Sequence, residues 1–303
     1  MSNSQYSIPL IHSTVGIMTP FLLAATGGLF TELAGMLNIA LEGLMLVGAF
    51  FGVVFISLTG DLFTGLLLGV AASMLVALMF GYISLYLRAN IFITGLATNL
   101  FASGLTVVLS FEFFGNKGVI QFPNIPTVPV FAVPEALQRI PVLGDIFFGH
   151  SILVYLSWLI VAISAIVIYK TPFGLRIRAT GMGPETVVSL GLKPRRYQLA
   201  AILISGFTCG IAGAFLTLGL AAFVPNITSG RGWIALVAIY LGNKNPFGIL
   251  IACFVFGFAE SFSNYAQGII KVPADYILAF PYIITVVAMI LFSAWKHYRS
   301  DAA

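Results

Sequence analysis

Charged residues are scarce in this chain. Asp, Glu, Lys and Arg make up 8% of its 303 residues, whereas 59% of the residues are hydrophobic and the mean hydropathy is +1.04. A soluble chain of this length carries roughly 25% charged residues. The deficit excludes a protein solvated by water on all sides and predicts an outer surface that faces lipid. The net charge of +4 indicates no nucleic-acid partner, because the basic excess lies in loops between apolar segments.

Residue sets that carry catalysis are also scarce. The three histidines, His12, His150 and His297, lie far apart in the sequence and form no metal-binding pattern. No G-x-x-x-x-G-K-[ST] loop is present to bind ATP phosphates, and no Ser/His/Asp set or carboxylate pair indicates a catalytic pocket. Cys209 and Cys253 lie within apolar runs and are expected to be buried packing residues rather than a disulfide. We therefore expect that this chain is not itself an enzyme.

Long apolar segments predict an all-α fold, a polytopic transmembrane helix bundle of about eight or nine spans. Each crossing needs about 20 mostly apolar residues. A shorter apolar segment, 233–241, lies between glycines and is expected either to cross as a broken element or to be re-entrant. The whole of 1–303 is predicted to form one transmembrane domain. The eight longer candidate spans are 13–31, 36–59, 62–87, 91–113, 151–169, 197–222, 247–268 and 276–295.

Basic residues predict the orientation of these spans. Six of the fourteen Lys and Arg residues lie in the segment 170–196. Placing this segment in the cytoplasm puts ten basic residues inside and four outside, in keeping with the positive-inside rule. The N-terminus is then outside and the C-terminus cytoplasmic. The segment 114–149 becomes an external loop, whose five prolines exclude a continuous helix. We expect a short helix near 134–139, in a loop that either receives an external partner or packs over the bundle.

The cytoplasmic segment 170–196 contains the pattern of a short helix. Gly183-Pro184-Glu185 is typical of a helix start, with proline at the first helical position and a carboxylate near the positive end of the dipole. Gly191 can end the helix in a left-handed conformation. Between them, Val187, Val188 and Leu190 are predicted to expose apolar side chains to the cytoplasm. The expected cover for these side chains is a partner protein.

Polar residues inside the predicted spans are candidates for a translocation path or a bend. Asn38 and Glu42 are four residues apart, so they are predicted to share one helical face after a bend at Gly35. Asn99 and Glu260 lie within other spans, where each must be bonded to a neighbour, paired, protonated or exposed to a cavity. For Asn38 and Glu42 we favour a structural role at a bend beside the path over direct contact with substrate.

Small residues recur at four-residue spacing in three spans. The sets are Gly48 with Gly52, Gly65 with Gly69, and Gly206 with Gly210 and Ala214. Such spacing lets helices approach closely in lipid. We predict close helix packing at each set.

Four segments resemble, in the same order, motifs of the permease subunits of bacterial ABC importers for nucleosides and simple sugars. These subunits belong to a larger group with the ribose and branched-chain amino-acid permeases, and the chain looks like the shorter of two paralogous permeases. The family usually has a basic residue shortly after the position of Glu32. Leu33 stands there in this chain, which removes one partner of a charge pair at the bend. The four segments are 27–50, 87–106, 174–199 and 230–248.

The resemblance implies partners and a location. The segment Gly183–Gly191 matches the coupling helix of the family, which inserts into an ATP-hydrolysing subunit. ATP and Mg²⁺ would bind that ATPase, and no cofactor is expected in this chain. A second permease, more readily a paralogue than a second copy, and an extracytoplasmic binding protein or lipoprotein would complete the complex in the bacterial inner membrane. The implied coupling residues are Arg178, Glu185, Val187, Val188, Leu190 and Gly191.

The resemblance also implies a class of substrate. The family transports purine nucleosides, related heterocycles such as riboflavin, or simple sugars. An ion-coupled secondary transporter is the alternative, and it would need coupling carboxylates and inverted repeats, neither of which is evident. A membrane-embedded enzyme or an assembly anchor would need a polar catalytic cluster at one interface.

Overall fold

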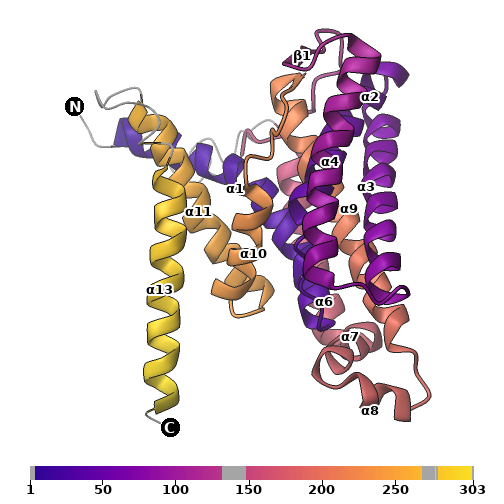
Figure 1. Ribbon diagram of the computed structural model, residues 1–303. Coiled ribbons are helices and arrows are strands. Elements are labelled where there is room, and N and C mark those ends of the chain that lie inside the picture. The colour runs from indigo at the N-terminus through magenta and orange to yellow at the C-terminus, as the bar shows by residue number, and fades with distance from the viewer. Residues whose placement is uncertain (1–3, 132–147, 268–276, 278, 302–303) are drawn as a thin grey trace.

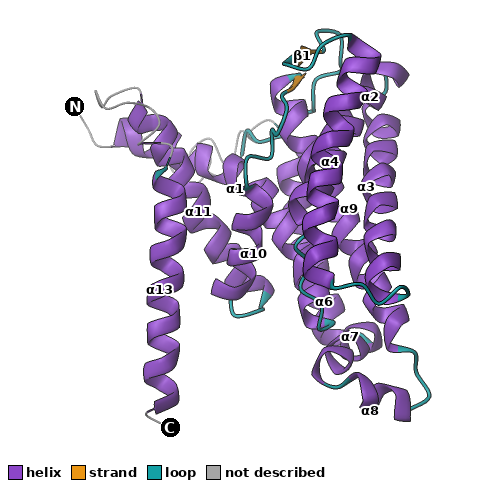
Figure 2. Cartoon of the chain, viewed as in Figure 1, coloured by secondary structure: helices purple, strands orange, loops and turns teal. Residues whose placement is uncertain are grey.

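The structure is a computed structural model that describes residues 4–131, 148–267, 277 and 279–301. Helices dominate this part of the chain, as the all-α prediction requires (Figures 1 and 2). Two short strands, β1 (Ile120–Gln121) and β2 (Ala222–Phe223), pair antiparallel. The helices are α1 (Ser4–Leu33), α2 (Leu41–Thr59), α3 (Leu62–Leu85), α4 (Ile91–Phe114), α6 (Ile152–Lys170), α7 (Pro172–Met182), α8 (Pro184–Ser189), α9 (Pro194–Leu220), α10 (Arg231–Leu241), α11 (Pro246–Gln267) and α13 (Phe280–Asp301).

Seven of the described helices are long and apolar enough to cross a membrane, namely α1, α2, α3, α4, α6, α9 and α11. They correspond to seven of the eight longer predicted spans. The apolar part of α13 that the structure describes, Phe280–Ile290, is shorter, and so is α10 with 11 residues. At 1.5 Å per residue α10 is too short to cross a bilayer alone. The second span begins at Leu41 rather than at residue 36.

The long helices form an inner and an outer set. The most apolar window of α1 is 89% buried, and α2 and α9 are also mostly buried, whereas the corresponding window of α4 is only 28% buried. The outer helices α3, α4 and α6 expose large apolar side chains, including Leu75, Leu100 and Ile166. A continuous apolar exterior of this kind is stable in lipid and not in water. The chain is therefore a multi-pass membrane protein.

Glycines bring the inner helices into backbone contact, as their spacing predicts. A Cβ added at Gly48 would lie 2.5 Å from the Cα of Gly210, so α2 and α9 touch there without side chains between them. A Cβ at Gly213 would lie 1.9 Å from the carbonyl oxygen of Met45 on the same pair of helices. The two cysteines, Cys209 and Cys253, are free and buried, as predicted.

The bundle has two distinct ends. The β1–β2 pair and the first turns of α1 lie at one end, whereas α7, α8 and the last turns of α13 lie at the other (Figure 1).

The turn between α2 and α3 is stabilised by Asp61, whose carboxylate accepts a hydrogen bond from the Thr64 backbone N–H at 2.7 Å. Hydrogen bonds from Thr64 lower the pKa of Asp61 below its usual value. The short helix predicted near 134–139 lies outside the described residues.

Candidate functional site

The chain leaves the helical conformation between α1 and α2. Gly35 has a φ of +78°, a left-handed conformation that glycine adopts readily, and the backbone becomes helical again only at Leu41. Asn38 therefore precedes the helix that contains Glu42, and the prediction that both residues share a helical face is wrong. The four-residue spacing has that meaning only on a continuous helix. Instead, Asn38 donates from Nδ2 to Ser205 Oγ at 2.8 Å and accepts from the Ala40 N–H at 3.1 Å.

Asn99 of α4 forms hydrogen bonds with the backbone at the end of this non-helical segment and at the start of α2. Its Oδ1 accepts a hydrogen bond from the Gly43 N–H at 2.8 Å, and its Nδ2 donates to the Ile39 carbonyl oxygen at 2.9 Å. Backbone groups that a broken helix leaves unpaired must find partners within the protein at membrane depth. Asn38 and Asn99 provide such partners. Both amides therefore make the contacts to neighbouring helices expected of structural residues.

Glu42 binds the start of α10. Its carboxylate accepts the Gly230 N–H at 2.8 Å and the Gly232 N–H at 2.6 Å. These N–H groups belong to the positive end of the α10 dipole, where an anion is stabilised. Glycine at 232 is required by the close approach, because a Cβ there would lie 2.5 Å from the Glu42 backbone nitrogen. The second span is thus fastened to the short helix through one carboxylate.

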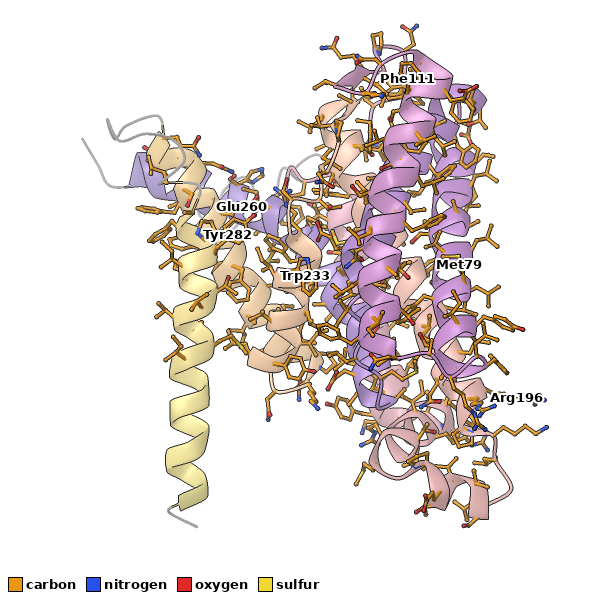
Figure 3. All side chains as sticks on the ribbon, viewed as in Figure 1. Met79, Phe111, Arg196, Trp233, Glu260 and Tyr282 are labelled. Carbon is orange, nitrogen blue, oxygen red and sulfur yellow. The ribbon has the colours of Figure 1, made fainter. Side chains whose placement is uncertain are left out.

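An ion pair lies beside this contact. Arg231 donates from Nη2 to Oε1 of Glu260 on α11 at 2.5 Å, so the carboxylate within the predicted span is paired. A charge at membrane depth is tolerated when it is paired or lines a cavity. Tyr282 of α13 donates its hydroxyl hydrogen to the Ser229 carbonyl oxygen at 2.6 Å. Figure 3 shows Glu260 and Tyr282 next to each other where α11 and α13 meet.

Two cavities meet at the residues that precede and begin α10. The larger has a volume of 620 Å³ and the smaller 330 Å³, both within the range of small-molecule sites. Ser229 and Arg231 line both of them. The larger cavity is also lined by His12, Ser13, Gly16, Ile17, Pro20, His150, Phe215, Leu216, Gly219, Leu220, Val224, Pro225, Asn226 and Ile227, and the smaller by Ile234, Glu260, Ser263, Asn264, Pro281 and Tyr282.

A charge pair does exist at the bend, although Leu33 replaces the neighbouring basic residue of the family. Glu32 binds the ammonium group of Lys244 at 2.8 Å and accepts a hydrogen bond from the Tyr240 hydroxyl at 3.0 Å. Lys244 lies three residues after the end of α10. No local pattern predicts this pair, because Lys244 lies more than 200 residues away from Glu32 in the sequence.

The predicted helix in the segment 170–196 is present as α8. Proline starts it at Pro184, and Gly191 beyond its end has a φ of +75°. Val188 and Leu190 are 59% and 72% exposed, and Glu185 is exposed. Val187, however, is only 1% exposed, so the prediction that its side chain belongs to the outer face is wrong. A six-residue helix presents one side to its own chain, and Val187 lies on that side.

The segment before α8 packs against the bend. A Cβ at Gly181 would lie 2.2 Å from the Leu33 carbonyl oxygen, and one at Gly35 would lie 3.0 Å from the Gly181 Cα. Gln198 of α9 donates a hydrogen bond to the Ala34 carbonyl oxygen at 3.3 Å. Arg178 of α7 lies over the ring of Tyr169, 5.5 Å from its centre. The helix α7, which directly precedes α8 in the chain, therefore contacts the bend between α1 and α2.

These features define a class: a membrane-embedded helical bundle with cavities among its helices and a short helix with exposed apolar side chains at one end. That is the architecture of a transport permease. Residues 10–289 match the family described as branched-chain amino acid transport system / permease component, and the chain belongs to this family. It is a permease subunit of the ABC importer type.

Relatives agree with this assignment over most of the chain. The guanosine ABC transporter permease NupQ of Bacillus subtilis is 34% identical over 92% of this chain and 90% of its own. The nucleoside ABC transporter permease NupC of Lactococcus lactis is 32% identical over 90% and 89%. A candidate glucose ABC transporter permease of Haloferax volcanii, TsgC13, is 32% identical over 87% and 79%.

The fold itself is shared with two solved structures. PsaBC from Streptococcus pneumoniae has a TM-score of 0.51 at 14% identity, with 91% of this chain and 89% of that chain covered. An inward-facing ABC transporter, a candidate of the metal-chelate type, has a TM-score of 0.52 at 14% identity, with 93% and 85% covered. Within the described residues no group of three or more His, Cys, Asp or Glu side chains is arranged to hold a metal ion.

Proposed function

We propose that the chain forms the translocation path of an importer for a nucleoside or a simple sugar. The substrate class is supported by the relatives above, which are described as permeases for guanosine, for nucleosides and, as a candidate, for glucose. Riboflavin is not among the substrates these relatives name, so we restrict the proposal to nucleosides and sugars. An extracytoplasmic binding protein delivers the substrate to the end of the bundle that carries the β1–β2 pair.

The observation that carries the proposal is the exposed apolar surface of α8. We assign Glu185, Val188 and Leu190 to docking on a separate ATPase subunit, which binds ATP and Mg²⁺. Next to α8 lies a groove of 800 Å³, lined in part by Val188 and by the basic residues Arg195 and Arg196. An apolar helix tip beside a basic groove supports a protein partner, because exposed apolar side chains together with arginine are typical of protein interfaces.

Transport requires that the ATPase changes the shape of the path. ATP binding shifts the equilibrium between two forms of the permease only if the ATPase contacts differ between the forms. The packing of Gly181 against Gly35 supplies a route, since a movement of α8 displaces α7 and thereby the bend between α1 and α2. The bend is joined to α10 through Glu42, and α10 borders both cavities.

A second permease completes the path, and we favour a paralogue over a second copy. This chain is 34% identical to NupQ and 23% identical to NupP, which are two guanosine permeases of one organism, Bacillus subtilis. The different degrees of identity support a correspondence to one member of such a pair. The outer helices α3 and α4 offer apolar faces that either lipid or the second permease can cover.

The proposed orientation places the N-terminus outside and the C-terminus in the cytoplasm. It is supported by the ten basic residues that lie inside against four outside, and by α13, which ends at the same end of the bundle as α8 (Figure 1). A reporter that is active only in the cytoplasm is expected to work after Arg299 or within 180–183. The same reporter is expected to be silent within 123–130, and the reverse pattern would contradict the orientation.

The proposed function is tested by uptake into proteoliposomes that hold the complete complex with its ATPase and binding protein. Val188→Asp places an unpaired charge in the docking surface, so we expect at least a tenfold loss of ATP-driven uptake and loss of co-purification with the ATPase. Val130→Asp is the matched control, because Val130 is equally exposed at the opposite end of the bundle. It should retain the ATPase. Full uptake by Val188→Asp would contradict the assignment of α8.

A further inference from the structure

The lining of the smaller cavity suits a neutral ligand that carries hydroxyl groups. Its polar lining comes from Arg231, Glu260, Ser263 and Asn264, together with the hydroxyl of Tyr282. Arg231 and Glu260 neutralise each other as an ion pair, so the cavity carries no net charge that would favour an ion. Hydrogen-bond donors and acceptors still line the cavity. The guanidinium donates, the carboxylate accepts and the amide does both, so together they can bind hydroxyl groups as donors and as acceptors.

Two of these groups have hydrogen-bonding capacity that the protein does not use. Arg231 donates a hydrogen bond to Oε1 of Glu260, and Oε2 accepts no hydrogen bond from the other described residues. The amide of Asn264 is exposed and likewise makes no hydrogen bond within the described part of the chain. Glu260 and Asn264 lie four residues apart on α11, so both side chains are on one face of the helix. Adjacent hydroxyl groups of a ligand can therefore bind both residues at once.

The larger cavity has a different lining. Phe215, Leu216 and Leu220 provide apolar walls, and the imidazole rings of His12 and His150 stack with centres 4.0 Å apart and planes inclined by 13°. Apolar and aromatic walls favour a flat ring system that can pack against them. Both cavities are lined by Ser229 and Arg231, so they lie next to each other. Figure 3 shows where Glu260 and Tyr282 of the smaller cavity lie.

We propose that the two cavities form one nucleoside site, with the base in the larger cavity and the pentose in the smaller, where Glu260 and Asn264 bind its hydroxyl groups. The inference rests on the proposed transport function and narrows it, since a simple sugar would leave the apolar cavity empty. A free base would leave the polar cavity empty. Only a molecule that joins a flat ring to a hydroxylated ring uses both linings.

The test compares uptake of guanosine with uptake of 2′,3′-dideoxyguanosine by the complete complex in proteoliposomes. The variant is Asn264→Leu, and the matched control is Gln267→Leu, which removes an amide from the same helix outside both cavities. The binding protein is the same in every preparation, so a change in the ratio of the two uptake rates reports on the permease alone. Glu260→Gln serves as a second variant that keeps the side-chain shape.

We expect wild type to prefer guanosine and Asn264→Leu to reduce this preference about five- to tenfold, as the loss of one hydrogen bond predicts. Gln267→Leu should keep the wild-type ratio. An unchanged ratio in both Asn264→Leu and Glu260→Gln would overturn the pentose assignment while leaving the transport function intact. Uptake of ribose by the wild-type complex without uptake of any nucleoside would overturn the nucleoside site and retain the importer. Absence of ATP-driven uptake of either compound would contradict the proposed function itself.

Discussion

Glu42 is the side chain whose replacement is most informative. Its carboxylate accepts two N–H groups at the start of α10, from Gly230 and Gly232, and it is partly buried. In Glu42→Gln one oxygen can still accept one of these hydrogen bonds, but the new NH₂ group faces the second N–H. One hydrogen bond is therefore lost and two donors are brought together. In Glu42→Leu both N–H groups lose their partner.

The magnitudes follow from the two hydrogen bonds. A hydrogen bond to a charged group contributes about 1.5–3 kcal/mol, so Glu42→Gln should cost about this amount and Glu42→Leu about twice as much. For a chain of this size 1 kcal/mol corresponds to a shift in Tm of about 2 °C. We therefore expect Tm to fall by about 3–6 °C for Glu42→Gln and by about 6–12 °C for Glu42→Leu.

Thermal unfolding of the detergent-solubilised complex, followed by intrinsic fluorescence, measures these shifts. Glu112→Gln is the matched control, because Glu112 is an exposed residue near the end of α4, and its Tm should equal that of wild type. Equal Tm values for Glu42→Gln and Glu112→Gln would refute the reasoning. Loss of uptake by Glu42→Gln at an unchanged Tm would show that the carboxylate acts in transport rather than in fastening α10.

Two further predictions concern the packing of the bundle. Gly213→Ala forces a methyl group against the Met45 carbonyl oxygen and should destabilise the complex by about 1–3 kcal/mol. Gly104→Ala is the control: its methyl group meets open space and should stabilise α4 by about 0.5–1 kcal/mol. Equal Tm values for these two variants would contradict the packing of α2 on α9. For the ion pair between Glu32 and Lys244, a double-mutant cycle with Gln at each position should give a coupling free energy of about 0.5–1 kcal/mol in unfolding measurements, and a value of zero would contradict the pair.

Local patterns in the sequence predicted local structure. Gly183-Pro184 and Gly191 placed the short helix α8, because proline at a first turn and a left-handed glycine beyond the end act through the neighbouring backbone alone. The glycine spacing at Gly48 likewise predicted a close helix contact. Most spans followed from the length of the apolar runs, since a bilayer sets the number of residues that cross it.

Contacts between distant segments could not be predicted in this way. Glu260 is four residues from Asn264 along the helix, and nothing in that spacing indicates that its carboxylate pairs with Arg231. The prediction that Asn38 and Glu42 share a helical face is wrong because α2 begins only at Leu41, after Asn38. Asn99 and Ser205 from other helices stabilise the non-helical segment before it. Tertiary hydrogen bonds thus decide where the second span begins.

The sequence also does not indicate which valine of α8 is buried and which is exposed. Val187 and Val188 are both apolar and adjacent, so either could have faced the partner. Only the position of α8 against the rest of the chain makes Val187 buried and Val188 exposed. A helix of six residues is too short for an apolar period to distinguish its two sides.

Cross-linking tests most directly whether α8 is the surface through which ATP hydrolysis acts on this permease. Leu190→Cys and Val130→Cys place single thiols at exposed positions at opposite ends of the bundle, and the native Cys209 and Cys253 are buried and should not compete. A thiol-reactive photo-cross-linker on the complete complex should join Leu190→Cys to the ATPase subunit and leave Val130→Cys without that product. Cross-linking of the ATPase from Val130→Cys, with none from Leu190→Cys, would contradict the account.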